Sequence, residues 1–295
     1  MKILNIGSCN IDYVYTLNHI VAPGETETSS KMETFPGGKG LNQSIAAARA
    51  GAKVYHAGCV GEGSEILTDI LCDSNVDISL LKKLDMKNGH AVIQVASSGE
   101  NSIFLYPGSN EALTKEYIDS VIENFDKGDI LLLQNEVNLV SYAVDKAYEK
   151  GMQVVLNPSP YNEKIGEIDF NKLSYIILNE VEASALSGKS DAKDALYFIA
   201  EKYPDLKVML TLGKKGCIYK DSNTEISQNA FTVKAVDTTA AGDTFTGYFL
   251  SGITEGKEIS EILKTASAAS AIAVSKMGAA PSIPEKAEVE KFNCV

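Results

Sequence analysis

The sequence is poor in basic residues. It has 27 Lys and Arg against 39 Asp and Glu, which gives a formal net charge of -12 at pH 7. A nucleic-acid surface needs clustered Lys and Arg to neutralise phosphates, so this deficit argues against a nucleic-acid partner. It does not argue against a single nucleotide, because local backbone N–H groups and one or two cations are enough to bind one.

Long apolar runs are also missing. No stretch approaches the ~20 apolar residues that a membrane span requires. The first seven residues, MKILNIG, are too short an apolar run for a signal peptide and predict an opening strand instead. No two cysteines have metal-ligand spacing, so reduced thiols in a cytoplasmic protein are expected. The five are Cys9, Cys59, Cys72, Cys217 and Cys294.

Several motifs are incomplete. His19, His56 and His90 are far apart and form no zinc or triad pattern. The segment 187–190 resembles the end of a phosphate-binding P-loop, but Ala183 occupies the position of its first glycine. Residues 180–187 instead predict a helix that ends before Gly188. Residues 38–43 begin like a dinucleotide fingerprint but lack its third glycine.

The order of apolar runs predicts the fold class. Short continuous apolar runs alternate with helical patterns such as 41–50 and 140–150, which is typical of βαβ units in a parallel sheet buried on both faces. We therefore predict an α/β fold with a mostly parallel central sheet flanked by helices. The predicted strands are 3–6, 54–57, 130–133, 154–156, 175–178 and 208–210.

Two segments, 13–35 and 88–106, alternate like strands without intervening helices. They predict a small antiparallel β lid inserted into a single domain that spans 1–295. The pattern fits an edge extension of the main sheet equally well. The four predicted strands are 13–21, 26–35, 90–95 and 102–106.

The segment 236–247 carries the strongest chemical signal. A predicted strand, 231–236, leads through a turn of small residues into a predicted helix, 243–250. The free N–H groups of Ala240, Ala241, Gly242 and Asp243 and the helix dipole would form a pocket for negative charge. The carboxylate of Asp243 could accept a proton there, as phosphoryl transfer requires, or could simply cap its helix. Gly242 and the Ala pair beside it favour the catalytic interpretation.

Two motifs carry a family resemblance. The segment 237–245, DTTAAGDTF, resembles the C-terminal signature of the ribokinase-like (pfkB) carbohydrate kinases, and 37–43, GGKGLNQ, resembles their N-terminal signature. The likeness covers nearly the whole chain. It continues through 7–12, 23–26, 156–158, 179–182 and 278–282.

This resemblance implies an ATP-dependent sugar kinase that phosphorylates the primary hydroxyl of a pentose, ribose by preference. Asp243 would be the base, and Ala240, Ala241 and Gly242 would complete the anion hole. Carboxylates and amides suit a polyhydroxylated substrate, because several hydroxyls must be fixed at once. The implied sugar contacts are Asn10, Asp12, Gly38, Lys39, Asn42, Glu136 and Asp243.

The resemblance also implies the nucleotide and cation sites. Glu182 would order water bound to Mg²⁺, and a K⁺ ion would be held mostly by backbone oxygens. The sequence departs from the family at 266–268, which leaves the adenine contacts open. The implied nucleotide residues are Asn179, Thr211, Leu212, Gly213, Lys214, Lys215, Gly216, Gly242 and Asp243. The implied K⁺ residues are Asp237, Thr239, Ala273, Lys276, Gly278 and Ser282.

Alternatives remain at this point. A kinase for deoxyribose, a hexose or a nucleoside would use the same motifs, although Asn10, Asp12 and Glu136 favour a small free sugar. A non-catalytic sugar-binding regulator would gain nothing from Asp243. Alternating apolar residues in the lid predict an interface, and the family pairs two lids in a homodimer. These residues are Ile93, Val95, Ile103 and Leu105.

Overall fold

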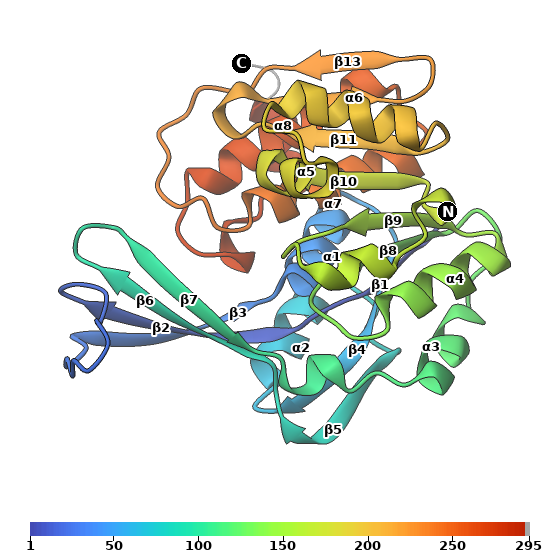
Figure 1. Cartoon of the computed structure of the whole chain (residues 1–295). Coiled ribbons are helices and arrows are strands. Elements are labelled where there is room, and N and C mark those ends of the chain that lie inside the picture. Colours follow the sequence, from blue (N-terminus) through green and yellow to red (C-terminus); the bar gives the residue numbers. More distant parts are fainter. Residues whose placement is uncertain (293–295) are drawn as a thin grey trace.

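The computed structural model describes residues 1–292 and contains two sheets (Figure 1). The larger sheet has nine strands in the order β13-β12-β11-β10-β9-β8-β1-β4-β5. All neighbouring pairs are parallel except β11–β12 and β12–β13. The predicted mostly parallel sheet is therefore confirmed. Its strands are β1 (Ile3–Ile6), β4 (Val54–Glu62), β5 (Leu81–Lys87), β8 (Ile130–Gln134), β9 (Gln153–Asn157), β10 (Tyr175–Asn179), β11 (Lys207–Thr211), β12 (Cys217–Lys220) and β13 (Glu225–Gln228).

Helices cover both faces of this sheet. Side chains of one strand alternate between two cores: Ile3 packs in the core under α1, α2, α7, α8 and α9, and Leu4 packs in the core under α3 to α6. Burial on both faces explains the continuous apolar runs of the central strands. The helices are α1 (Lys39–Arg49), α2 (Glu65–Asp73), α3 (Lys115–Ile122), α4 (Val140–Lys150), α5 (Glu180–Ser187), α6 (Ala192–Lys202), α7 (Ala241–Thr254), α8 (Ile259–Val274) and α9 (Lys286–Phe292). In the described part of the chain, no helix is long and apolar enough to cross a membrane.

The smaller sheet, which we call the lid, projects from one side of the body (Figure 1). Its order is β3-β2-β6-β7. The outer pairs are antiparallel hairpins, as predicted, but the central pair β2–β6 is parallel because both strands leave the body in the same direction. The first hairpin is also shorter than predicted on its second strand, which begins at residue 31. The strands are β2 (Asn10–Leu17), β3 (Lys31–Gly37), β6 (His90–Ala96) and β7 (Asn101–Tyr106).

The predicted strand 231–236 is wrong. Residues 229–240 contain no strand or helix, and the strand before α7 is β13. Val236 instead donates its N–H to the carbonyl of Val274 at 2.8 Å, and its side chain is 52% exposed. The segment is therefore tied to the end of α8 and has no strand beside it to pair with.

Two small-residue features position the helices that matter for the site. A Cβ on Gly247 would lie 2.4 Å from the Cβ of Ala46, so α7 packs closely against α1. Gly38, which precedes α1, has φ of 95°, a conformation that favours glycine. The N-terminal ends of α1 and α7 lie together at the site.

The predicted helix over residues 180–187 is confirmed as α5, and Gly188 ends it with φ of 71°.

Candidate active site

Two cavities meet at the start of α7. One, of about 550 Å³, lies between the lid and the body, and we call it the lid cavity. The other, of about 540 Å³, lies beside α8 and the segment 230–235, and we call it the α8 cavity. Four residues line both cavities, so the two spaces adjoin there. They are Thr211, Thr238, Ala241 and Gly242.

The N-terminus of α7 supplies the predicted anion pocket. Ala240 precedes the helix in the left-handed conformation, with φ of 59°, which is strained for alanine and recurs at functional sites. Within residues 1–292, the N–H groups of Gly242 and Asp243 donate to no backbone oxygen outside the helix. These two free donors and the helix dipole favour an anion at this point.

The carboxylate of Asp243 is buried between α7 and α1 and lines the lid cavity. Its Oδ2 accepts a hydrogen bond from Asn42 Nδ2 at 3.0 Å, and its Oδ1 accepts one from Gln43 Nε2 at 2.8 Å. Asp243 therefore lies at the anion pocket and does not merely cap its own helix, since its side chain is bonded to another helix.

The predicted sugar residues converge on the lid cavity. Glu136 accepts hydrogen bonds from Ser8 Oγ at 2.5 Å and from the Lys39 N–H at 3.0 Å. Asn10 Oδ1 accepts one from Asn110 Nδ2 at 2.7 Å, which leaves the Asn10 NH₂ available for a ligand. The structure places all seven predicted residues on this cavity's wall. They are Asn10, Asp12, Gly38, Lys39, Asn42, Glu136 and Asp243.

Charges in the lid cavity influence one another. The negative charge of Asp243, with those of Glu136 and Glu182, raises the pKa of Lys39 and so keeps its ammonium charged. Burial raises the pKa of Glu136. Burial and the neighbouring Glu136 raise the pKa of Asp12 to about 7. The cavity is thus a cluster of carboxylates around one cation, a set suited to accept hydrogen bonds from hydroxyl groups.

The raised pKa of Asp12 predicts that the stability of the folded protein depends on pH. Its pKa is about 7 in the folded protein and about 3.9 in an unfolded chain. The folded state therefore holds this proton more tightly, and the corresponding stability is lost as pH rises from about 4 to about 7. We expect Asp12→Asn to raise the free energy of unfolding, measured in urea without ligand, more at pH 8 than at pH 5. The exposed Asp205→Asn is the matched control, and an equal effect of Asp12→Asn at both pH values would contradict this prediction.

The predicted nucleotide residues fall mainly on the α8 cavity. Four members of the run 211–216 line it: Thr211, Gly213, Lys214 and Gly216. The other two, Leu212 and Lys215, do not, because Leu212 packs on the core and Lys215 points to Glu180 at 3.7 Å. Asn179 lines the lid cavity instead, where its side chain and that of Glu182 form the capping box of α5. Of the segment 266–268, only Ser267 reaches the α8 cavity.

The predicted K⁺ residues come together in part. Asp237 Oδ1 accepts hydrogen bonds from the N–H and the hydroxyl of Thr239, and its Oδ2 accepts one from Gly278 N–H at 2.9 Å. Burial opposes ionisation of Asp237, but these bonds outweigh it and lower its pKa. Ala273 and Ser282 are fully buried nearby in the chain, whereas the ammonium of Lys276 turns away to pair with Glu288 at 2.8 Å.

Some cavity residues were not predicted as such: Ile93, Ile103 and Leu105 were assigned to an interface, and the others were assigned to no site. The lid contributes Ala91, Ile93, Ile103 and Leu105 to the lid cavity, and Phe231 and Val233 line the α8 cavity. Strand alternation signalled the lid residues as apolar but not what they would cover. The predicted strand 231–236 concealed the α8 cavity residues, since it assigned them to a sheet.

The three histidines and the cysteines within residues 1–292 take no part in either cavity wall. His56 is fully buried against Ser44 Oγ and Cys9 Sγ, and burial lowers its pKa to about 4. Among residues 1–292, Cys9, Cys59, Cys72 and Cys217 are free thiols, as predicted, and Cys294 lies outside the described residues.

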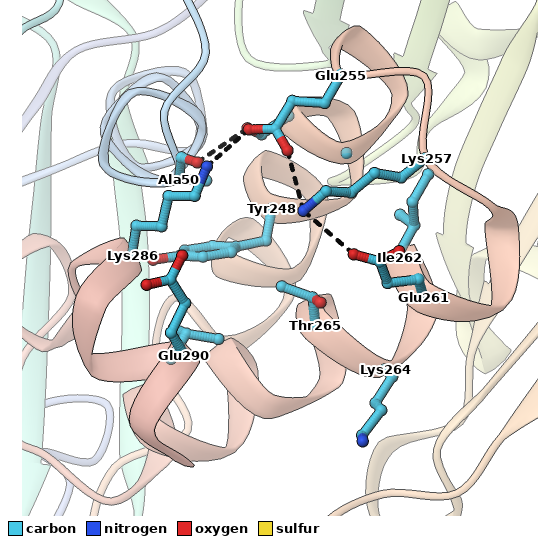
Figure 2. A pocket seen from close by; sticks show the side chains of 13 residues that line it. Ala50, Tyr248, Glu255, Lys257, Glu261, Ile262, Lys264, Thr265, Lys286 and Glu290 are labelled. Atoms are coloured by element: carbon cyan, nitrogen blue, oxygen red, sulfur yellow. Dashed lines mark hydrogen bonds and ion pairs between the residues drawn. The ribbon is translucent and has the colours of Figure 1, made fainter. Parts of the chain in front are cut away.

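A further hollow of about 380 Å³ lies at the opposite end of α7, bordered by α8 and α9 (Figure 2). Four of its charged side chains pair with one another: Glu255 contacts Lys286 at 2.7 Å and Lys257 at 3.0 Å, and Lys257 also contacts Glu261 at 3.3 Å. The paired charges and the C-terminal end of α7 give no anion pocket here. The chemistry therefore belongs to the other end of the helix.

Comparisons with known proteins agree with this arrangement. The model of the pfkB family carbohydrate kinases matches residues 1–286. The ribokinase of Haemophilus influenzae is 36% identical over 296 residues, which cover 97% of this chain and 96% of the relative. The crystal structure of ribokinase from Thermotoga maritima is similar with a TM-score of 0.88 at 34% identity and covers 100% of both chains. The structure of Arabidopsis thaliana ribokinase complexed with ribose and ATP has a TM-score of 0.86 at 27% identity, covering 99% of this chain and 98% of that one. The resemblance seen in the two signature motifs is confirmed, and the chain belongs to the pfkB family of carbohydrate kinases.

Proposed function

We propose that this protein transfers the γ-phosphate of ATP to the primary hydroxyl of D-ribose and forms ribose 5-phosphate. One observation carries the proposal: the two cavities adjoin at the N-terminus of α7, where Asp243 faces the lid cavity. The sugar binds in the lid cavity and ATP in the α8 cavity. A hydroxyl and a phosphate can thus meet at Gly242 and Asp243, at a helix start that favours negative charge.

Asp243 acts as the base that accepts the proton of the attacking hydroxyl. Its two hydrogen bonds to Asn42 and Gln43 fix the carboxylate in place. The free backbone N–H groups of Gly242 and Asp243 stabilise the charge that develops on the transferring phosphoryl group. The N–H of Ala241, also predicted to be free, instead donates to the Thr238 carbonyl at 3.3 Å. The sugar hydroxyls are held by Asn10, Asp12, Lys39 and Glu136, and the backbone of Gly38 adjoins them.

Mg²⁺ and K⁺ complete the proposed site. Glu182 fits a role near Mg²⁺, because it is a buried carboxylate on the lid cavity wall, and Mg²⁺ keeps several waters and few protein ligands. When bound with ATP, Mg²⁺ would neutralise phosphate charge. The ionised Asp237 and the backbone carbonyls of the segment 273–282 fit K⁺, since carbonyl oxygens can replace its hydration shell. The Lys276 ammonium cannot ligate a cation, so only its backbone oxygen would contribute.

The sugar assignment is tested with a coupled assay of ADP release across ribose, deoxyribose, hexoses and nucleosides. Ribose is expected to give the highest kcat/KM. A higher value for a nucleoside or a hexose would overturn the ribose assignment, and ADP release unaffected by any sugar would overturn the kinase assignment. We also propose a cytoplasmic location, which immunoblotting of separated cell fractions would test.

The proposed K⁺ site predicts a salt effect. At constant ionic strength, replacing Na⁺ by K⁺ should raise the initial rate several-fold, because the ion lies beside the anion pocket. Asp237→Asn should remove most of this difference, since the carboxylate is the only formal charge in the proposed ligand set. Equal rates of the unmodified protein in the two salts would contradict a functional cation site.

We also propose a single domain over 1–295 in which the lid, formed by 13–35 and 88–106, pairs with the lid of a second copy. Ile103 and Leu105 are 53% and 46% exposed, and Phe104 and Tyr106 on the other face of β7 are 58% and 47% exposed, so β7 carries a contiguous run of exposed apolar side chains of the kind that marks an interface. Ile93 pairs with Ile103 across the hairpin and lies on the same face. Each lid would then close over its own sugar and exclude water from the transfer.

The proposed dimer predicts that Ile93→Asp with Leu105→Asp gives a monomer by light scattering at micromolar concentration, with a raised KM for ribose. The body should unfold at an unchanged temperature, because the lid projects from it. Ser102→Asp on the opposite face of β7 is the matched control and should remain a dimer. An unmodified protein that is monomeric and fully active would refute this proposal.

A further inference from the structure

A buried amide, Gln43, contacts the carboxylate of Asp243 from behind the lid cavity. Its Nε2 donates to Asp243 Oδ1 at 2.8 Å, while Asn42 Nδ2 donates to Asp243 Oδ2 at 3.0 Å. Asn42 is on the wall of the lid cavity, but Gln43 is not among the described residues that line it and is 0% exposed. Gln43 therefore reaches the carboxylate but not the space that a substrate would occupy.

A backbone carbonyl fixes which end of the Gln43 amide faces Asp243. Asn5 Nδ2 donates to the Gly40 carbonyl at 2.7 Å, and a carbonyl can only accept, so Asn5 Oδ1 must face the other way. Gln134 Nε2 donates to this Oδ1 at 3.1 Å and to Gln43 Oε1 at 2.7 Å. With its oxygen occupied, Gln43 presents its NH₂ group to Asp243.

A second carbonyl fixes the same orientation independently. Asn157 Nδ2 donates to the Ile177 carbonyl at 2.8 Å, so Asn157 Oδ1 faces Gln43 and accepts from Gln43 Nε2 at 3.0 Å. A rotated Gln43 amide would place its oxygen against Asn157 Oδ1 and Asp243 Oδ1, and its NH₂ against that of Gln134. Three like pairs would then repel one another, which excludes the rotated state.

Gln134 also leaves one atom without a partner. Its Oε1 is buried and accepts no hydrogen bond within the described residues. Such atoms are rare in proteins. Rotating the Gln134 amide would not relieve it, because the oxygen would then face Asn5 Oδ1 and Gln43 Oε1. The unpartnered atom follows from the need to donate twice toward Gln43 and Asn5.

We propose that Gln43 is a positioning residue for phosphoryl transfer: it holds the Asp243 carboxylate in a fixed orientation, and Gln134 sets the direction of the Gln43 amide. Hydrogen bonds donated to the charged form of a carboxylate favour that form, and two donors on different oxygens prevent its rotation. This inference rests on the proposed role of Asp243 as the base. The other charged groups facing Asp243 are Lys39 of α1 and Glu136 after β8, and the variants below leave both unchanged.

The test compares three variants of the full-length protein in steady-state kinetics with ribose and ATP between pH 5 and pH 9. Gln43→Met removes the donor, and kcat should fall by ~10–100-fold, the cost of a misplaced reacting group. The KM for ribose should stay within about threefold, because Gln43 does not line the sugar site. In Gln43→Glu, a second carboxylate faces Asp243, and the acidic limb of the kcat profile should move up by about one pH unit. Gln134→Glu should also lower kcat, but by a smaller factor than Gln43→Met.

Ser44→Ala is the matched control. Ser44 is also buried on α1 and contacts Asn5 Nδ2 at 2.8 Å. It makes none of the hydrogen bonds that run from the Gly40 carbonyl through Asn5, Gln134 and Gln43 to Asp243. Its kcat should stay within about twofold of the unmodified protein. If Gln43→Met does not fold, the nearly isosteric Gln43→Glu decides alone through its pH profile. An unmoved acidic limb with kcat above half of normal, or a loss confined to KM, would overturn the inference. An unmodified protein that phosphorylates no sugar would instead overturn the proposed function.

Discussion

Asp243→Asn is expected to lower kcat by ~10²–10⁴-fold, the usual contribution of a positioned base. The variant keeps the size of the side chain and its place between α7 and α1, so the fold should be retained. The lid cavity keeps its other sugar contacts, so the KM for ribose should change little. Single-turnover kinetics with ribose and ATP, together with calorimetric titration of ribose, would measure both quantities.

This prediction separates the base from a helix cap. A capping residue would affect stability, at about 1 kcal/mol, and leave the rate of transfer almost unchanged. A variant that retains more than about a tenth of normal turnover would therefore exclude Asp243 as the base.

Gly242→Val is expected to reduce kcat by ~100-fold or more, because a side chain there would displace the reacting groups. Gly242 lines both cavities, and a Cβ at this position meets nothing within 4 Å, so the added side chain would enter open space between them. Valine also has a higher helix propensity than glycine, and α7 should form normally. Steady-state kinetics would measure the expected fall in kcat, and the unfolding temperature would show whether α7 forms normally.

Gly166→Val is the control for Gly242→Val. A Cβ on Gly166 also meets nothing within 4 Å, and this residue lines neither cavity. Its activity should be unchanged. If Gly242→Val folds and turns over at the normal rate, then the phosphate does not pass Gly242, and the two cavities do not act together.

The fold could be predicted where one stretch of chain carries the whole signal. Continuous apolar runs predicted the central strands because these are buried on both faces, and Gly188 marked the end of α5. The edge strands β5 and β13 were not predicted, because their half-exposed sequences resemble loops. Residues 231–236 alternate like a strand but find no strand to pair with, which the sequence alone does not reveal.

The residues of the candidate site also differ in how far the sequence could predict them. Asp243, Gly242 and the sugar residues lie in short motifs, so residue type and spacing were informative. The contribution of Ile103 and Leu105 to the lid cavity depends on how the lid folds over the body. The hydrogen bonds of Gln43 join α1 to β8, β9 and α7, and only the three-dimensional arrangement brings those side chains together.

The central claim is that the γ-phosphate of ATP is transferred to the primary hydroxyl of ribose at Asp243. The most direct measurement is ³¹P and ¹³C NMR of a reaction with ATP, Mg²⁺, K⁺ and ribose labelled with ¹³C at C5. The account predicts one ADP for each phosphorylated sugar and a C5 signal split by phosphorus, both lost in Asp243→Asn. Inorganic phosphate as the product, phosphorus coupled to another carbon, or an unaffected Asp243→Asn reaction would contradict it.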